Sequence, residues 1–166
     1  MQEQEKFFNQ LVEKYSEPLY WHVREMVGSH DDTNDLLQEI FIKVWKALPS
    51  FRGDSDPFTW LWRIATNETI SHLRKARVRA ALSFSRLDAE AERVSDPNPD
   101  FDGNAAMAKL RKAIAGLPDK QRLVFSMRYW EELSYEQISE ITGTSVGALK
   151  ASYHLAYEKI KAYLSD

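Results

Sequence analysis

The chain has 166 residues, enough for one ordinary domain or two small ones, and its 43% hydrophobic content supports a folded core. It contains no cysteine, which excludes disulfides, thiolate catalysis and cysteine-ligated zinc. Its net charge of −3 is unusual for a protein that binds DNA unaided, because such proteins neutralise phosphates with surplus basic residues. The N-terminus is polar and no long apolar run occurs, so we expect a cytoplasmic protein without membrane insertion.

The first half of the chain shows helical periodicity in three stretches. The apolar positions of the first two stretches are Phe7, Phe8, Leu11, Val12 and Tyr15, then Leu36, Leu37, Ile40, Phe41, Val44, Trp45 and Leu48. Asp31, Asp32 and Asn34 precede the second stripe as N-caps or first-turn residues would, and Pro49 follows its last turn. A polar loop leads to a third helix, expected from about residue 58 to 75. No strand-like alternation occurs over a useful length, so the predicted fold is all-α.

Periodicity fades between about residues 80 and 104, where Ser, Asp, Asn and two prolines accumulate. This composition predicts a flexible linker between a domain at 1–79 and a second at 105–166. The alternative is one domain with a long loop, although compact domains rarely carry structureless loops of this size. Residues 60–79 are mainly basic and residues 86–102 mainly acidic. Such a chain is expected to bind DNA poorly alone and to need a partner that contributes affinity.

The second half of the chain contains the strongest local pattern. Two short helices are expected first, one ending near Gly116 and one between Pro118 and Trp130. Ser134 followed by Gln137 then forms a capping box at a helix only two turns long. Gly143 marks a turn, and either Thr144 or Ser145 caps a longer helix. The apolar positions expected to face inward on that longer helix are Val146, Leu149, Tyr153, Ala156, Ile160 and Leu164.

A short helix, a glycine turn and a longer helix form the layout of a DNA-binding helix-turn-helix. The outer face at the start of the second helix carries Gly147, Lys150, Ala151 and His154. Small residues permit close approach to a groove, and a lysine can reach a phosphate or a guanine. The alternative interpretation is a helical hairpin with a solvated face.

Three segments of the first half resemble region 2 of RNA polymerase sigma factors. Residues 35–45 (DLLQEIFIKVW) are similar to its core-polymerase-binding helix. Residues 51–55 (FRGDS) and 58–67 (FTWLWRIATN) resemble its promoter-melting loop and its −10-reading helix.

The second half resembles sigma region 4. Residues 117–122 (LPDKQR) and 133–138 (LSYEQI) are similar to the opening of that region, and 145–150 (SVGALK) to the start of its −35-reading helix. The motifs follow the family order, and no counterpart of the middle regions of larger sigma factors occurs between them. The chain thus resembles the two-domain, extracytoplasmic-function (ECF) type of the sigma-70 family, an alternative sigma factor and not an enzyme.

The resemblance implies core RNA polymerase as partner, through its β′ clamp helices and its β flap, and it implies one set of residues that contact the clamp helices. That set is Asp35, Gln38, Glu39 and Phe41. Polar groups beside an apolar ridge suit a helix-on-helix contact, in which the ridge supplies burial. Leu36, Ile40 and Val44 on the same segment are expected to be plain core.

A second implied set reads and melts the −10 element. It comprises Arg52, Gly53, Asp54, Ser55, Asp56, Phe58, Trp60, Trp62, Arg63, Asn67, Arg74 and Lys75. A loop and an amide can enclose and hydrogen-bond an unstacked base, and aromatic rings can support stacking. At least one of Phe58, Trp60 and Trp62 is expected to be only core. The basic residues of this set, together with Arg77, would hold phosphates, with a solvated basic face as the alternative.

The third implied set reads the −35 duplex: Ser145, Gly147, Lys150, Ala151, His154 and Leu155. This helix offers fewer arginines than many relatives, which favours DNA shape or contacts with thymine methyl groups over guanine reading. The extra Asp56-Pro57 in the loop likewise departs from the family pattern.

Two other classes of function remain as alternatives. An enzyme would need a phosphate loop, a zinc-ligand pair or a Gly-flanked serine, and none occurs. No cofactor or metal is expected, since the four histidines are scattered and Asp31, Asp32 and Asp35 resemble helix capping. A free-standing regulator would bind a duplex alone. The resemblance also implies an anti-sigma factor as partner. The sequence leaves open whether the two domains pack together in the free protein, an arrangement expected to hide both DNA surfaces.

Overall fold

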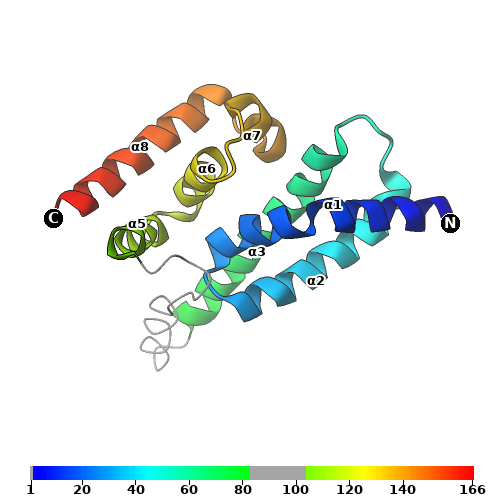
Figure 1. The fold of residues 1–166 in the computed structure, drawn as a ribbon, viewed down its shortest axis with the longest axis horizontal. Coiled ribbons are helices and arrows are strands. Elements are labelled where there is room, and N and C mark those ends of the chain that lie inside the picture. The colour runs from blue at the N-terminus through cyan, green and yellow to red at the C-terminus, as the bar shows by residue number, and fades with distance from the viewer. Residues whose placement is uncertain (1, 83–103) are drawn as a thin grey trace.

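The computed structural model describes residues 2–82 and 104–166, and within them every regular element is helical (Figure 1). The expected all-α fold is confirmed. The flexible linker was predicted mostly for residues that lie outside the described ranges. The described helices form two groups, one on each side of that stretch of chain.

The N-terminal group contains three α-helices, α1 (Gln2–Val27), α2 (His30–Ala47) and α3 (Pro57–Ala81), with a short 3-10 turn, η1 (Leu48–Ser50), after α2. Ser29 caps α2 by accepting from the amide of Asp32, so Asp31 and Asp32 occupy its first turn rather than its cap. Pro57 begins α3 at a position where its missing N–H has no intrahelical partner to lose. Helix α3 continues past the expected end near residue 75, to Ala81.

The core of the N-terminal group lies among the facing sides of these three helices. Its fully buried side chains include Leu19, Val23, Leu36, Ile40, Val44, Leu61 and Ala65. Leu36, Ile40 and Val44 recur at spacings of four, so one face of α2 points inward and leaves the opposite face to solvent. The expectation that these three residues are core is confirmed. Trp45 was also placed on the inward stripe, but it is 38% exposed.

The C-terminal group contains four helices: α5 (Ala105–Ala115), α6 (Asp119–Tyr129), α7 (Tyr135–Thr142) and α8 (Val146–Ser165). The capping box at Ser134 and Gln137 is present in both directions, with distances of 3.1 and 2.9 Å. Gly143 ends α7 in the left-handed region with φ 75°, and Ser145, not Thr144, caps α8. Helices α7 and α8 are therefore the predicted helix-turn-helix.

A small apolar cluster holds the C-terminal group together. It consists of Ala113, Ile114, Leu117, Phe125, Ala156 and Ile160, from α5, α6 and α8. The inward stripe of α8 was expected to run from Val146 to Leu164. Its burial is concentrated at Leu149, Ala156 and Ile160, and Leu164 is 41% exposed because α8 projects beyond its neighbours at the C-terminal end (Figure 1).

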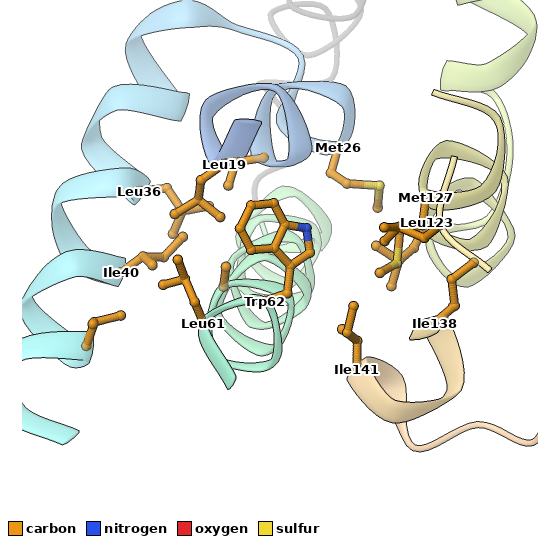
Figure 2. Close-up of a cluster of buried hydrophobic side chains, with 14 of the residues drawn as sticks. Leu19, Met26, Leu36, Ile40, Leu61, Trp62, Leu123, Met127, Ile138 and Ile141 are labelled. Carbon is orange, nitrogen blue, oxygen red and sulfur yellow. The ribbon is translucent and has the colours of Figure 1, made fainter. Parts of the chain in front are cut away.

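The two groups pack directly against each other, an arrangement we call the closed arrangement. Helix α6 contacts α1, and α7 contacts α3. One continuous apolar cluster runs across the contact: Figure 2 shows Trp62 and Met26 on the N-terminal side and Met127, Ile138 and Ile141 facing them. The sequence offered this packing only as a possibility for the free protein.

Candidate nucleic-acid interface

The exposed face of α2 carries the residues predicted to bind core polymerase. Asp35, Gln38 and Glu39 are exposed, and Phe41 is half-buried with its ring edge-on to Phe8, at a centroid distance of 6.2 Å. Trp45 packs against the same Phe8 ring at 5.3 Å. The structure thus places polar groups beside an aromatic ridge, as a helix-docking surface requires.

Two apolar residues extend this surface and were not among the predicted contacts. Ile42 is 55% exposed and Trp45 is 38% exposed. Large apolar side chains this open to water, on the same helix as the predicted contacts, are a usual feature of protein-binding surfaces. The sequence signal was available in the spacing: position 42 falls between the core positions 40 and 44, so it must point away from the core.

The predicted −10 loop lies between η1 and α3. Arg52, Gly53, Asp54 and Asp56 are exposed and Ser55 is half-buried. Gly53 has φ 75°, a conformation that costs other residues about 1–2 kcal/mol, so glycine is needed for this turn. The loop is accessible in the closed arrangement.

Aromatic rings line the junction of the loop with α3. Phe51 and Trp60 lie with ring centroids 4.7 Å apart, and Phe58 and Trp62 lie 4.2 Å apart. Phe58 and Trp60 are half-buried, whereas Trp62 is 1% exposed. Trp62 is therefore the core member that was expected among the three aromatic residues, and in the closed arrangement it does not face solvent.

The remaining predicted −10 residues lie along α3. Arg63, Asn67 and Arg74 are spaced by four and seven residues and so share one face of the helix. Asn67, Arg74 and Lys75 are exposed. Arg63 instead donates from Nε to the backbone carbonyl of Glu140 at 2.7 Å, at the C-terminal end of α7. The helix-turn-helix domain thus occupies one of the residues predicted to hold DNA.

A second polar contact between the two groups centres on Glu131, in the loop between α6 and α7. Its Oε2 accepts from Nδ1 of His22 at 2.7 Å, and its Oε1 accepts from the indole N–H of Trp62 at 2.8 Å. Nε2 of the same His22 lies 2.9 Å from the hydroxyl of Thr66. His22, Trp62 and Thr66 are each at most 3% exposed, so one carboxylate from the C-terminal group is bound in a buried polar slot of the N-terminal group.

Two ion pairs also join the groups, one partly buried at Glu25 and one more exposed at Asp119. Arg111 of α5 donates to both carboxylate oxygens of Glu25 at 2.6 and 2.8 Å, and Arg77 of α3 pairs with Asp119 of α6. Arg122 lies between these pairs. Its burial lowers the pKa of its guanidinium, while the nearby carboxylates of Glu25 and Asp119 act in the opposite direction. Opposite charges therefore face one another across the contact between the two groups.

The predicted −35 surface is open. Gly147, Lys150, Ala151 and His154 are exposed at the start of α8, and Leu155 is 52% exposed. No atom lies within 4 Å of the position that a Cβ on Gly147 would take, so this stretch of helix has free space before it. The Nζ of Lys150 lies 5.8 Å from the ring centroid of Tyr135, close to α7. Ser145 is engaged as the N-cap, accepting from the amide of Ala148 at 3.2 Å.

Two further observations concern the described residues as a whole. Within the described residues, no cluster of His, Asp and Glu could hold a metal ion. None of the described helices is long and apolar enough to cross a membrane.

Comparison with known proteins defines the class first. Residues 11–79 match the family description "Sigma-70 region 2", and residues 107–160 match "Sigma-70, region 4". The two matches correspond to the two helical groups, in that order along the chain.

Full-length relatives narrow the class further. The chain is 30% identical to the ECF RNA polymerase sigma factor SigW of Bacillus subtilis, over 96% of this chain and 89% of the relative. It is 32% identical to the ECF RNA polymerase sigma-E factor of Escherichia coli K12, over 94% of this chain and 85% of the relative. The chain belongs to the ECF RNA polymerase sigma factors.

Solved structures share the fold. The sigma factor RpoE in complex with the anti-sigma factor NepR from Bartonella quintana has a TM-score of 0.74 and 23% identity, over 96% of this chain and 98% of that chain. CnrH in complex with the cytosolic domain of CnrY has a TM-score of 0.69 and 23% identity, over 97% and 89% of the two chains.

Proposed function

We propose that this ECF sigma factor acts in three contacts: α2 docks on core RNA polymerase, the loop at 52–56 with α3 reads and melts the −10 element, and α8 reads the −35 duplex. The observation that carries the proposal is the order and exposure of the surfaces. An aromatic ridge with polar neighbours, a glycine-containing loop beside a basic helix and an open helix-turn-helix occur on one chain that matches both sigma regions.

Docking on the β′ clamp helices uses the exposed face of α2. Phe41, Ile42 and Trp45 supply apolar area, and burial of such area at about 25 cal/mol per Å² is the main source of affinity. Asp35, Gln38 and Glu39 flank the ridge and fix the register of the contact. Because polymerase contributes this affinity, an acidic chain can still act on DNA.

Reading of the −10 element combines a loop with a helix face. The exposed loop can close over a base that has left the stack, and the amide of Asn67 can hydrogen-bond the edge of that base. Arg63, Arg74 and Lys75 would hold the phosphates of the opened strand. Phe58 and Trp60, which are half-buried, offer ring faces for stacking.

Reading of the −35 element uses the start of α8. Gly147 and Ala151 permit close approach to the groove, Lys150 reaches a phosphate or a guanine, and Leu155 can contact a thymine methyl group. With one lysine and no arginine on this face, we expect discrimination by shape and methyl contacts to exceed that by guanine hydrogen bonds.

An anti-sigma factor is a further proposed partner, and the cytoplasm, where RNA polymerase works, is the proposed location. The solved RpoE and CnrH structures each contain a bound protein, NepR and the cytosolic domain of CnrY. The shared fold supports the idea that this chain can also be held by such a partner. Co-purification from cells, with and without a candidate protein, tests it.

Run-off transcription with core RNA polymerase on a library of genomic fragments tests the main proposal. Discrete transcripts that need this protein are expected, and their upstream sequences would define both promoter elements. If no new transcripts form with this protein, and the protein alone binds duplex DNA tightly, a free-standing regulator would be favoured instead.

A further inference from the structure

The closed arrangement includes a contact with unusual chemistry. Beside the apolar cluster that joins the two groups, Glu131 brings a carboxylate to two donors of the N-terminal group. The indole N–H of Trp62 can only donate, so the carboxylate oxygen must accept from it. The other oxygen faces Nδ1 of His22, which then carries a proton, and Nε2 of that ring faces Thr66.

The loop that presents Glu131 is fixed by its own backbone. The amides of Trp130 and Glu131 both donate to the carbonyl of Ser126, at 3.0 and 3.2 Å, and the amide of Leu133 donates to Met127 at 3.1 Å. Glu132 has φ 57°, a left-handed conformation that non-glycine residues rarely adopt. The backbone of the C-terminal group itself therefore fixes the loop that carries Glu131.

The same contact prevents simultaneous reading of the two promoter elements. Elements at −35 and −10 are about 25 base pairs apart, which is roughly 80 Å along the duplex. In the closed arrangement α7, the neighbour of α8, contacts α3 directly through Arg63 and Glu140. Because α7 and α3 are in direct contact, the −10 and −35 surfaces lie much closer together than the two promoter elements do. The groups must separate before both elements are read.

Separation of the two groups would open the slot to water. The slot also suits reversible contact, because His22 and Trp62 can each hydrogen-bond to water once Glu131 leaves. An interface made only of apolar side chains would have no groups that could hydrogen-bond to water after separation.

We propose that Glu131 is an autoinhibitory latch: by occupying the His22–Trp62–Thr66 slot it holds the free protein closed, and its release allows the two DNA-reading domains to separate. The inhibitory part of the inference rests on the proposed function of the two surfaces. The conformational part does not, since it concerns only the free protein.

The test measures separation of the groups directly. Because the chain has no cysteine, single cysteines at the exposed positions 13 on α1 and 158 on α8 can carry spin labels specifically. Pulsed dipolar spectroscopy of the free, full-length chain then compares wild type, Glu131→Ala, Glu131→Gln and Glu132→Gln. Glu132→Gln is the matched control, because it removes the same charge one residue away, on an exposed side chain.

Removal of a charged acceptor that serves two buried donors is expected to raise the ratio of open to closed protein roughly ten- to hundredfold for Glu131→Ala. A smaller rise is expected for Glu131→Gln, which keeps one acceptor oxygen, and no change for Glu132→Gln. An unchanged distance distribution in a Glu131→Ala protein with wild-type circular dichroism would overturn the latch.

Transcription assays separate the latch from the proposed function. With limiting core polymerase, Glu131→Ala is expected to give more transcript than wild type at equal concentration. If the groups separate in Glu131→Ala but transcript does not rise while wild type is active, the contact is not inhibitory. If wild type itself gives no transcript, the proposed function fails, and the distance measurement still decides whether Glu131 holds the groups together.

Discussion

One face of α3 and the start of α8 are both predicted to read promoter DNA, yet they differ in their exposure to solvent in the closed arrangement. On α3, Trp62 is buried and Arg63 is bonded to the end of α7. On α8, Gly147, Lys150 and His154 remain exposed. Packing of the two domains therefore covers part of the −10 side and leaves the −35 side free.

The difference follows from how each helix is used in the fold. Helix α3 contacts α1, α2 and α7, so between Pro57 and Leu73 only Asn67 is exposed, and the other exposed residues of the helix lie at its C-terminal end. Helix α8 packs on α5, α6 and α7 through one stripe and keeps the opposite face open. Domain packing can therefore cover a DNA-reading surface on a central helix such as α3, but not one on a peripheral helix such as α8.

The largest expected effect is on the free energy of unfolding, which should respond strongly to a change on the buried face of α3 and weakly to one on the open face of α8. Trp62→Ala should reduce the free energy of unfolding by about 3–5 kcal/mol, because it removes a fully buried aromatic side chain that contacts both groups. Leu155→Ala, on the open face, should change it by no more than about 0.5 kcal/mol. Urea denaturation measures both. A loss below about 1 kcal/mol for Trp62→Ala would contradict the burial of this side chain.

The next effect concerns DNA affinity on the open face. Lys150→Ala should weaken holoenzyme binding to its promoter by about 1–3 kcal/mol if Lys150 reads a base. If Lys150 holds only a phosphate, the loss of affinity should be similar for all DNA sequences. The salt dependence of binding should then correspond to about one fewer released counterion. Filter binding at several salt concentrations separates the two. Lys161→Ala, exposed near the C-terminal end of α8, is the matched control and should have little effect.

Two glycines that flank the cap of α8 should respond in opposite directions. Gly143→Ala should destabilise the protein by about 1 kcal/mol, because Gly143 adopts φ 75°. Gly147→Ala should stabilise it by up to about 1 kcal/mol, because Gly147 is helical and a Cβ meets no atom within 4 Å. The same methyl group stands on the −35 surface, so promoter affinity should fall while stability rises. Thermal unfolding and promoter binding of each variant provide the comparison.

The smallest effect is expected at the edge of the closed arrangement. Arg77→Gln removes the pair with Asp119, but the Arg77 side chain is 61% exposed, so the change in unfolding free energy should be at most about 1 kcal/mol. The effect should disappear at high salt. Arg79→Gln, two residues away and also exposed, controls for the general loss of charge on α3. A salt-independent loss above 2 kcal/mol would show that the edge, and not the slot, carries the contact.

The sequence predicted best those features whose causes are local. The capping box at Ser134, the left-handed Gly143 and the four-residue spacing of the α2 core are each specified by a few neighbouring residues. They located the helix-turn-helix and the core face of α2 correctly. Trp45 and Leu164 were placed inward because they fit the spacing, but the neighbouring helices do not cover them.

The contact between the domains could not be predicted in this way. Glu131 and His22 are 109 residues apart, and neither belongs to a repeating pattern. A single glutamate after a helix has no sequence signature that distinguishes a buried acceptor from a solvated charge. Only the packing of α6 on α1 and of α7 on α3 brings the carboxylate to its slot.

A reversible lock tests most directly the claim that the closed arrangement is incompatible with promoter reading. Cysteines placed at the paired positions 77 and 119 can be joined by a short cross-linker that contains a cleavable disulfide, since the chain has no other cysteine. We expect the cross-linked protein to give no transcript with core polymerase, and full transcription to return after reduction, to the level of the same variant never cross-linked. Undiminished transcription from the cross-linked protein would contradict the claim.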